Sequence, residues 1–363
     1  MEKMLPVNQK SMVLVAPRKM EPREFPIPDV QSEDMLLKVD LVSICGGDPI
    51  EYEGKNVKAK YPMILGHEMV GTVASVGESA QRTYGVAVDD RVTVEPYILC
   101  RQCEYCLNGY YQLCTNPRVY GINISCDESP YLWGAYGEYL YVAPGSKVHR
   151  IFDDVPDEAA ALSSVLGNGI RWIRTKAEVK FGETVVVLGA GAQGLVSVIA
   201  AKEANARRII VVGKEKLQLK WDLAKDFGAD HLIDLELVDD PVSAVKEIND
   251  GKLADVVVEC TGASSVMELG LDIAKPCGRV VLVGTTGFAK SALTTDKIVF
   301  KELTVLGGLG QSWDTEIAVD IINSKKYQIE RMVTDVFPLN EADQAINYFM
   351  NNPDKALRVA IKP

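Results

Sequence analysis

Four cysteines lie close together in the first third of the chain and could bind one metal ion. In the pattern C-x2-C-x2-C-x7-C they are Cys100, Cys103, Cys106 and Cys114. Gaps of two residues let consecutive thiolates converge on one tetrahedral zinc ion, with each sulfur about 2.3 Å from the metal. Four thiolates fill the coordination shell, so the predicted zinc is structural and not catalytic. An iron–sulfur cluster is the alternative, although ferredoxin-type sequences use tighter spacing and a following proline.

A second group of metal-binding residue types lies where two apolar segments end. Cys45 begins the motif CGGD, which ends at Asp48. His67 and Glu68 follow the run YPMIL, in the motif GHE. A catalytic zinc takes about three protein ligands and leaves one position open for substrate. The group is therefore a candidate catalytic metal site, although a buried cysteine or a core histidine, taken singly, is common.

The segment GAGAQG has the spacing of a dinucleotide-binding turn. It follows the apolar run TVVVL and opens the helical run LVSVIAAKEA. Gly189 permits a tight turn, Gly191 lets the backbone approach a pyrophosphate, and Gly194 lets the helix pack closely on the strand. The start of the helix then offers free N–H groups and a favourable dipole to the phosphates. The predicted cofactor-binding residues here are Gly189, Gly191, Ala192, Gln193 and Gly194.

The end of the next apolar run, RRIIVVG, bears on the choice of nucleotide. Gly213 stands where an acidic residue would hold the ribose 2′-hydroxyl of NAD, and Lys214 and Lys216 follow it. Without that acid, a 2′-phosphate is not repelled, and either lysine could pair with it. The sequence therefore favours NADP over NAD, while Glu215 leaves NAD open as the alternative.

Composition narrows the classes of partner. The chain has 363 residues, a formal net charge of -11 and no stretch of about 18 uncharged apolar residues. These properties argue against nucleic-acid binding and against a membrane partner. The N-terminal segment MEKMLPVNQK lacks the apolar core of a signal peptide. We expect a cytoplasmic protein that acts on a small molecule, and in a reducing compartment clustered cysteines hold metal more often than they form disulfides.

Two domains are expected from the length and from a change of pattern along the chain. Short β-like runs broken by Pro, Gly and Asp fill residues 11–150, which predicts an all-β domain of irregular barrel type. A helical segment near Pro156 then leads into strands that alternate with helices, which predicts a doubly wound parallel sheet over about 155–295. The terminal run ALRVAIKP needs strand partners, so the C-terminal segment is expected to return to the first domain.

Taken together, these motifs resemble those of the zinc-dependent medium-chain alcohol dehydrogenase family, which includes sorbitol, threonine and butanediol dehydrogenases. The similarity also covers GAYGEYLYV, DVVVECTGA and ALRVAIKP, and so spans nearly the whole chain. It implies an α/β protein with a GroES-like catalytic domain at 1–154 and 296–363, a structural zinc lobe near 95–116, and a Rossmann cofactor-binding domain at 155–295. The family also implies a site in the cleft between the domains and a homodimer or homotetramer.

By the same resemblance, Cys45 and His67 ligate a catalytic zinc, and Glu68 is a ligand that exchanges with water or substrate. Asp48 orients these ligands and pairs with Arg358. Arg358 is also counted among the cofactor-binding residues. The implied complement is one structural and one catalytic zinc per chain.

Three departures from the family pattern concern the catalytic zinc and the proton that leaves the alcohol. Gly47 stands where the family usually has Ser or Thr, and Ile50 stands where a histidine is common. The stretch Ser163-Ser164-Val165 lacks the Glu that ligates the metal in polyol-type members. The remaining routes for the proton are bound water, Ser164, Glu51 and Tyr52.

The resulting prediction is a hydride transfer between a secondary alcohol and NAD(P), giving a ketone. The segment Asn168-Gly169-Ile170-Arg171-Trp172 and the missing Glu resemble relatives that act on bulky or cyclic alcohols. A polyol or amino-alcohol dehydrogenase, an enone reductase without catalytic zinc, and a non-catalytic homologue are the alternatives. The predicted role of Cys126, Cys260 and Cys277 is ordinary packing.

Overall fold

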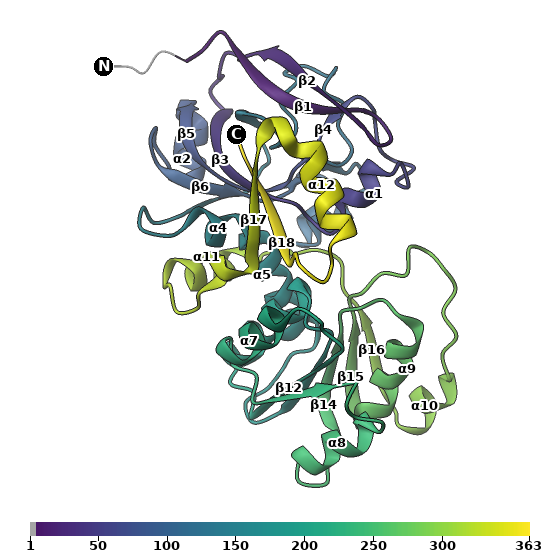
Figure 1. Ribbon diagram of the computed structural model, residues 1–363. Helices are drawn as coiled ribbons and strands as arrows, with labels where there is room; N and C mark the ends of the chain where they lie inside the picture. Colours follow the sequence, from purple (N-terminus) through teal and green to yellow (C-terminus); the bar gives the residue numbers. More distant parts are fainter. Residues whose placement is uncertain (1–4) are drawn as a thin grey trace. The chain divides into compact units, whose positions relative to one another are not determined.

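The computed structural model describes residues 5–363 and divides into two units. Unit 1 comprises residues 1–164 and 319–363, and unit 2 comprises residues 165–318. Each unit has its own buried apolar core. The two are described separately below, and Figure 1 labels the elements of both.

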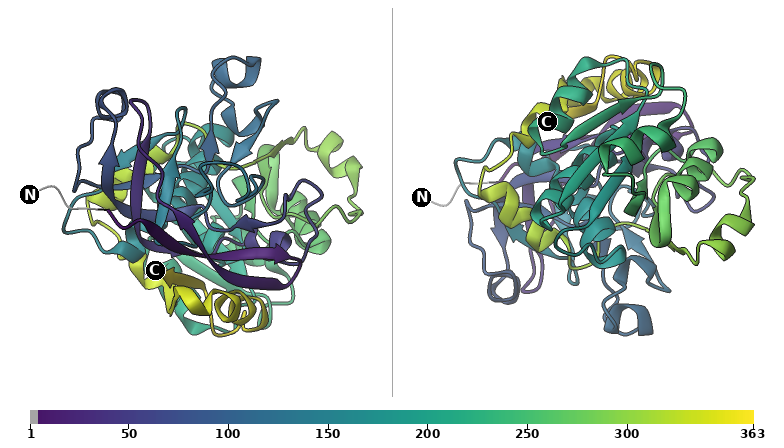
Figure 2. Two further views of the ribbon diagram at one scale, coloured as in Figure 1. Left: turned by 90° about the horizontal axis from the view of Figure 1, so that it is seen from above. Right: turned by 90° about the horizontal axis from the view of Figure 1, so that it is seen from below.

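Unit 1 is built mainly of antiparallel strands. They are β1 (Asn8–Ala16), β2 (Lys19–Pro26), β3 (Met35–Ser43), β4 (Met63–Ile64), β5 (Glu68–Val76), β6 (Arg91–Val94), β7 (Tyr97–Ile98), β8 (Arg118–Val119), β9 (Tyr139–Val142), β10 (Val148–Arg150), β17 (Val333–Pro338) and β18 (Arg358–Lys362). The largest sheet has the order β10-β6-β5-β3-β18-β17, with β9 also paired to β3. A smaller sheet has the order β2-β1-β4, and its hairpin β1–β2 is the pair of long purple arrows in Figure 2.

The helices of unit 1 are short. They are α1 (Asp48–Tyr52), α2 (Glu78–Tyr84), α3 (Glu104–Leu107), α4 (Asp157–Ala161) and α12 (Ala342–Asn351), with 3₁₀ turns at Tyr111–Leu113, Ile329–Met332 and Leu339–Glu341. The C-terminal strand β18 lies between β3 and β17, antiparallel to the first and parallel to the second. The end of the chain therefore completes the sheet of the N-terminal segment, as the sequence predicts.

Unit 2 is a doubly wound parallel sheet. Its strands are β11 (Thr184–Leu188), β12 (Arg208–Gly213), β13 (His231–Asp234), β14 (Ala254–Glu259), β15 (Ala274–Leu282) and β16 (Thr304–Gly307), in the order β13-β12-β11-β14-β15-β16. Its helices are α6 (Ala192–Glu203), α7 (Gln218–Asp226), α8 (Pro241–Ile248), α9 (Ser264–Ile273) and α10 (Thr295–Phe300). The helices α6 and α7 pack together, as do α8, α9 and α10, and the two groups cover opposite faces (Figure 1). This is the predicted Rossmann arrangement.

Two helices cross the boundaries between the units. They are α5 (Ser163–Ile170), continued by a π-helical turn at Arg171–Lys176, and α11 (Thr315–Asn323). The structure differs from the sequence-based boundaries at both crossings. Residues 155–164, assigned from sequence to the Rossmann domain, lie in unit 1. Residues 296–318, assigned from sequence to the catalytic domain, lie in unit 2 because β16 pairs in parallel with β15. The strand β16 is four residues long and largely exposed at the edge of the sheet.

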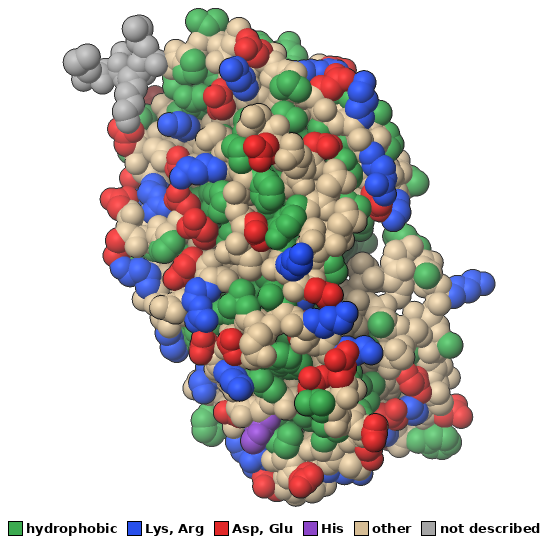
Figure 3. Space-filling model, viewed as in Figure 1, with side chains coloured by type: hydrophobic (Ala, Val, Ile, Leu, Met, Phe, Trp, Pro, Cys, Tyr) green, Lys and Arg blue, Asp and Glu red, His purple; other side chains and the backbone are tan. Residues whose placement is uncertain are grey.

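The isolated cysteines and the charged side chains differ in how far they are exposed. Cys126 is buried, as expected of a packing residue, but Cys277 is exposed in β15, with φ +58°. The packing role predicted for Cys277 is therefore wrong. Acidic and basic side chains are mixed over the face shown in Figure 3. Within residues 5–363, every helix is too short or too polar to span a bilayer.

Candidate metal and cofactor sites

Cys45 lies in the short turn between β3 and α1. The backbone N–H of Cys45 donates to Oδ2 of Asp48 over 3.0 Å, which closes the turn. The N–H of Gly47 donates to Sγ of Cys45 over 3.4 Å. A Cβ at Gly47 would lie 3.8 Å from that sulfur, an ordinary contact, so the glycine is not required by space.

His67 and Glu68 are presented by the start of β5. Gly66 before them has φ +93°, and a Cβ there would stand 2.5 Å from the ring of Tyr136. Both facts demand glycine at this position. The close approach of Tyr136 to the backbone thus sets the position from which His67 leaves the loop.

The structure brings the three predicted ligands together. One ligand atom each from Cys45, His67 and Glu68 lies within 4.8 Å of the others. Tetrahedral zinc ligands stand roughly 3.3 to 3.8 Å apart, so a small inward movement would complete a site. All three side chains are largely buried: His67 is 6% and Glu68 2% exposed.

The electrostatics of this group favour a bound cation. Burial, together with the charges of Glu68 and Asp48, raises the pKa of the Cys45 thiol well above its ordinary value. Burial likewise raises the pKa of Asp48. A dication beside these groups would lower both pKa values and stabilise the thiolate. The donor set therefore fits a zinc ion.

A second layer of side chains holds the ligands. Oδ1 of Asp48 lies 3.6 Å from Nδ1 of His67, so this carboxylate faces the imidazole ring. The hydroxyl of Tyr136 donates to Oδ2 of Asp48 over 2.9 Å. Sequence reasoning did not single out Tyr136, although it lies in the quoted motif GAYGEYLYV; only its contact with Asp48 shows its role.

Arg358 lies elsewhere than the sequence predicts. Its Nη1 donates to the carbonyl of Ile44 over 2.8 Å and to Oε2 of Glu68 over 3.2 Å. The predicted pairing of Arg358 with Asp48 is therefore wrong, because β18 pairs with β3 and places the guanidinium beside Glu68. Its part in cofactor binding stays a prediction.

The four-cysteine lobe has the geometry of a tetrahedral site. The Sγ atoms of Cys100 and Cys106 are 3.7 Å apart, and those of Cys103 and Cys114 are 3.9 Å apart. Four sulfurs at 2.3 Å from one ion would stand about 3.8 Å apart, whereas a disulfide would bring two sulfurs to about 2.05 Å.

Backbone N–H groups stabilise the thiolates of Cys100 and Cys103, whereas burial raises the pKa of Cys106 and Cys114. The N–H of Cys106 donates to Sγ of Cys103 over 3.4 Å, and the N–H of Cys103 donates to Sγ of Cys100 over 3.4 Å. Hydrogen bonds from the backbone of Cys106 and Thr115 lower the pKa of Cys103 to about 6. The lobe around α3 is the blue segment that projects from unit 1 in Figure 2.

The glycine-rich turn joins β11 to α6 in unit 2. Gly189 has φ +98°, and a Cβ on Gly194 would stand 1.9 Å from the carbonyl oxygen of Gly189. These two glycines are required by the fold itself. Gly191 has no atom within 4 Å of a hypothetical Cβ, so the space beside it is open. Gln193, in the first turn of α6, accepts a hydrogen bond from Nε1 of Trp172 over 3.4 Å.

The end of β12 places an acidic group beside that turn. Glu215 accepts a hydrogen bond from the N–H of Ala190 over 3.2 Å through Oε1, and its Oε2 pairs with Nζ of Lys220 at 2.7 Å. Gly213 is buried, whereas Lys214 and Lys216 are exposed. From the sequence, Glu215 was considered only as the alternative that favours NAD, and Lys220 was not considered. The ion pair of Lys220 with Glu215 depends on the position of the first turn of α7.

Comparison with known proteins agrees with both units. Residues 31–153 match the family model described as alcohol dehydrogenase GroES-like domain, and residues 179–324 match that described as zinc-binding dehydrogenase. A probable alcohol dehydrogenase of Mycobacterium tuberculosis is 40% identical over 326 residues, which are 88% of each chain. An L-threonine 3-dehydrogenase of Pyrococcus furiosus is 33% identical over 316 residues, 86% of each chain.

Solved structures share the whole fold. An alcohol dehydrogenase from Thermotoga maritima has a TM-score of 0.88 at 25% identity, covering 99% of this chain and 100% of its own. A putative zinc-binding dehydrogenase from Sinorhizobium meliloti, bound to NADP, has a TM-score of 0.85 at 27% identity, covering 98% and 99%.

Proposed function

Because the chain belongs to the zinc-dependent medium-chain alcohol dehydrogenase family, we propose that it oxidises a secondary alcohol to a ketone with NAD(P), and catalyses the reverse reaction. The carbinol carbon loses a hydride to the nicotinamide ring, and the hydroxyl oxygen loses a proton. The observation that supports this most directly is the convergence of Cys45, His67 and Glu68 within 4.8 Å. The open space at Gly191 supports the nucleotide half of the reaction.

We propose that Cys45, His67 and Glu68 hold the catalytic zinc and that the four-cysteine lobe holds a second, structural zinc. When bound, a catalytic zinc makes the alcohol hydroxyl more acidic and polarises the ketone carbonyl. The chain's own contribution is to orient the ligands: Asp48 faces His67, and Arg358 holds Glu68. The departure at Ser163-Ser164-Val165 leaves Glu68 as the third protein ligand.

Glu51 is the best-supported group for proton exit. It lies three positions after Asp48 in α1, so both carboxylates share one helix face, and both are buried. Within residues 5–363, Oε2 of Glu51 has no hydrogen-bond partner, while Oε1 accepts from Asn56 over 2.9 Å. Burial raises the pKa of Glu51 to about 7, which suits proton transfer near neutral pH. The alternative Tyr52 already donates its hydroxyl proton to Asp343 over 2.8 Å.

The choice between NADP and NAD depends on Glu215. A carboxylate at this place accepts hydrogen bonds from ribose hydroxyls and repels a 2′-phosphate, which supports NAD. The exposed Lys214 and Lys216 support the NADP preference derived from the sequence, which stays a prediction. Glu215→Gln removes the charge but keeps the size, so kcat/KM with NADP relative to NAD should rise on the order of tenfold. An unchanged ratio would assign the choice to the lysines.

The substrate is proposed only as a secondary alcohol. Two relatives are named L-threonine 3-dehydrogenase and sorbitol dehydrogenase. Their names refer to an amino alcohol and a polyol, so both of these substrate classes remain alternatives. Arg171 and Trp172, which suggested a bulky substrate, are 2% exposed each, and Arg171 pairs with Asp314 at 3.3 Å. Because both side chains are packed within unit 2, they do not support the preference for a bulky or cyclic alcohol. That preference stays a prediction.

We propose that two chains join through the free edge of the unit 2 sheet. The strand β16 ends the order of that sheet and pairs only with β15. Around it, Phe300 is 84%, Val305 36% and Leu309 58% exposed. An exposed apolar edge strand favours pairing with a second copy. Val305→Lys should shift the sedimentation coefficient from that of a dimer or tetramer towards that of a smaller species.

The test of the proposed function combines metal analysis with a substrate panel. The purified protein should contain two zinc ions per chain and should reduce NAD or NADP with some secondary alcohols, including polyols and threonine. Cys45→Ala should lose turnover and one zinc, whereas Cys126→Ala, a buried cysteine outside both clusters, should keep both. One zinc per chain with enone reduction would support the reductase, and no turnover with any substrate would support a non-catalytic homologue.

A further inference from the structure

A cavity lies at the amino ends of the unit 2 strands, at the opposite edge of the sheet from the glycine-rich turn. Its volume is about 590 Å³, and Thr184, the first residue of β11, lines it. The glycine-rich turn begins after Leu188, at the other end of the same strand. Five strand residues span roughly 17 Å. The cavity is therefore separate from the predicted cofactor-binding turn.

The lining of this cavity is basic although the chain as a whole is acidic. Four cationic side chains from separate segments line it, with one carboxylate: Arg207 before β12, Lys246 in α8, Lys252 in the loop after α8, Lys275 in β15, and Asp255 in β14. Four positive charges against one negative charge leave an excess of three, in a chain whose formal net charge is -11. A local field of this sign attracts anions.

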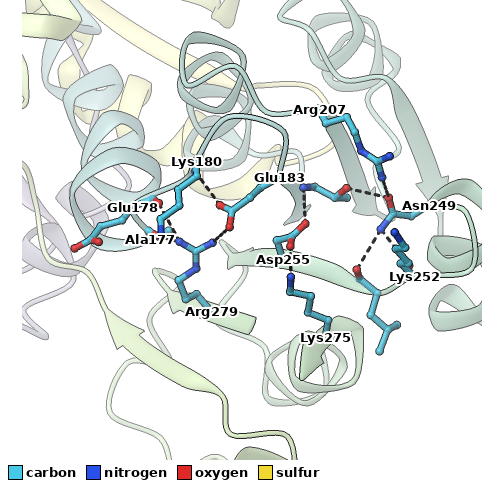
Figure 4. A network of polar contacts seen from close by, with 12 residues as sticks. Ala177, Glu178, Lys180, Glu183, Arg207, Asn249, Lys252, Asp255, Lys275 and Arg279 are labelled. Atoms are coloured by element: carbon cyan, nitrogen blue, oxygen red, sulfur yellow. Dashed lines mark hydrogen bonds and ion pairs between the residues drawn. The ribbon is translucent and has the colours of Figure 1, made fainter. Parts of the chain in front are cut away.

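The single carboxylate is already satisfied. Asp255 forms an ion pair with Lys275 and accepts a hydrogen bond from the N–H of Thr184 over 2.8 Å (Figure 4). Burial works against its ionisation, but these bonds, with the charges of Lys275 and Arg279, hold the pKa of Asp255 below its ordinary value. Asp255 and Lys275 thus neutralise each other. Of the other three cations, Arg207 also pairs with Asp250, and Lys246 and Lys252 carry the net positive charge of the lining.

A buried asparagine fixes the cavity wall. Asn249 is 1% exposed, and its Oδ1 accepts hydrogen bonds from Thr184 Oγ1 and from Arg207 Nη2, each over 2.9 Å. Its Nδ2 donates to the carbonyls of Lys252 and Leu253 over 3.2 and 3.1 Å. Figure 4 shows Arg207 pointing towards Asn249. The backbone that carries Lys252 and the guanidinium of Arg207 are therefore positioned before any ligand arrives.

Two lysines of the lining are uncommitted. In the part of the chain that the structure describes, neither Lys246 nor Lys252 has an ion pair, and both are exposed. Three further acidic residues lie on or next to α8. Glu247 is exposed, Asp240 caps α8 through the N–H of Ser243 and also feels the charge of Lys246, and Asp250 pairs with Arg207 at 3.4 Å and with Arg208 at 3.3 Å. Ammonium and guanidinium groups donate hydrogen bonds to phosphate oxygens, and here several of them line the same cavity.

We infer that this cavity binds a small phosphate-bearing anion through Lys246, Lys252 and Arg207. Its volume is that of a small-molecule site. A polymeric nucleic acid would be repelled by the acidic remainder of the chain. The site lies apart from the glycine-rich turn and is independent of the proposed dehydrogenase activity.

Calorimetric titration of the zinc-loaded, full-length protein with inorganic pyrophosphate, at constant ionic strength, tests this site. The double variant Lys246→Ala/Lys252→Ala removes two cavity charges. The control Lys225→Ala/Lys290→Ala removes two exposed lysines elsewhere in unit 2. Because all four lysines are exposed, both variants should fold. The first should bind pyrophosphate on the order of tenfold more weakly than wild type, and the control should bind like wild type.

Pyrophosphate could also bind at the glycine-rich turn, but that binding would be the same in both double variants. Equal affinity of the two variants, or no saturable binding by wild type, would overturn the inference. A parallel titration with citrate separates phosphate from carboxylate chemistry. Citrate should bind more weakly, and tighter citrate binding would overturn the assignment to phosphate.

Discussion

The hydroxyl of Tyr136 donates a 2.9 Å hydrogen bond to Asp48, and the ring of the same tyrosine lies against Gly66. One side chain therefore contacts both the carboxylate that faces His67 and the backbone from which His67 projects. Tyr136 is fully buried, and burial beside Asp48 raises the pKa of its hydroxyl well above the ordinary value. The hydroxyl stays protonated and remains a donor.

Tyr136→Phe should weaken the proposed catalytic zinc while leaving the fold intact. The ring keeps its place against Gly66, but Asp48 loses the donor that holds its carboxylate. Loss of such an outer contact typically lowers metal affinity by about 10- to 100-fold. Zinc retained after dialysis against a graded chelator measures this. Tyr120→Phe is the control, because Tyr120 is also buried but bonds to Ser146, and it should keep all of its zinc.

Gly66→Ala should destabilise the protein more than Gly85→Ala. Both glycines have positive φ, +93° and +66°, so both variants strain the backbone by about 1 kcal/mol or more. Only at Gly66 would the new Cβ meet an aromatic ring, at 2.5 Å, whereas at Gly85 nothing lies within 4 Å. The clash should add about 1 to 3 kcal/mol to the loss in unfolding free energy. Equal losses in urea unfolding would contradict this account.

Glu51→Gln should remove a pH dependence from alcohol oxidation. A proton acceptor must be deprotonated, so the wild-type rate should rise with pH through about 7, the pKa that burial gives Glu51. The variant should lack this rise and be slower on the order of 100-fold in kcat, with little change in KM. Glu53→Gln is the control, since Glu53 pairs with Arg18 and Lys55 instead. A wild-type pH profile in Glu51→Gln would exclude Glu51.

The same variant gives a stability test with a defined sign. The folded state holds the proton of Glu51 more tightly than the unfolded state, whose pKa is near 4.5. Its contribution to stability is present below that value and is lost as pH rises through about 7. Glu51→Gln should therefore be more stable than wild type at pH 8 by about 1 to 2 kcal/mol, since partial solvent access screens the charge. The difference should vanish near pH 4.5.

Gly191→Ala and Gly194→Ala should separate cofactor binding from folding. At Gly191 a methyl group meets no protein atom but enters the space where a pyrophosphate would approach. That variant should unfold like wild type and bind the nucleotide at least tenfold more weakly. At Gly194 the methyl group would stand 1.9 Å from a backbone oxygen, so that variant should lose stability. Chemical unfolding and nucleotide fluorescence titration measure the two effects.

From the sequence alone we predicted the two candidate metal-binding groups, the dinucleotide turn and the type of each unit. Two residues separate Cys100 from Cys103, and two separate Cys103 from Cys106, so the convergence of these thiols is a local property. The same holds for Gly189 and Gly194, whose spacing defines one turn.

Contacts between side chains that are far apart in the chain became visible in the folded structure. Arg358 and Glu68 are 290 residues apart, and they pair because β18 inserts beside β3. Residues 304–307 join the sheet of unit 2 because β16 pairs with β15. The sequence of a short, exposed strand does not indicate which sheet it joins. The basic cavity, likewise, gathers side chains from four segments that share no motif. Local spacing carries no information on such contacts, because they depend on the order and register of strands that the chain brings together from its two ends.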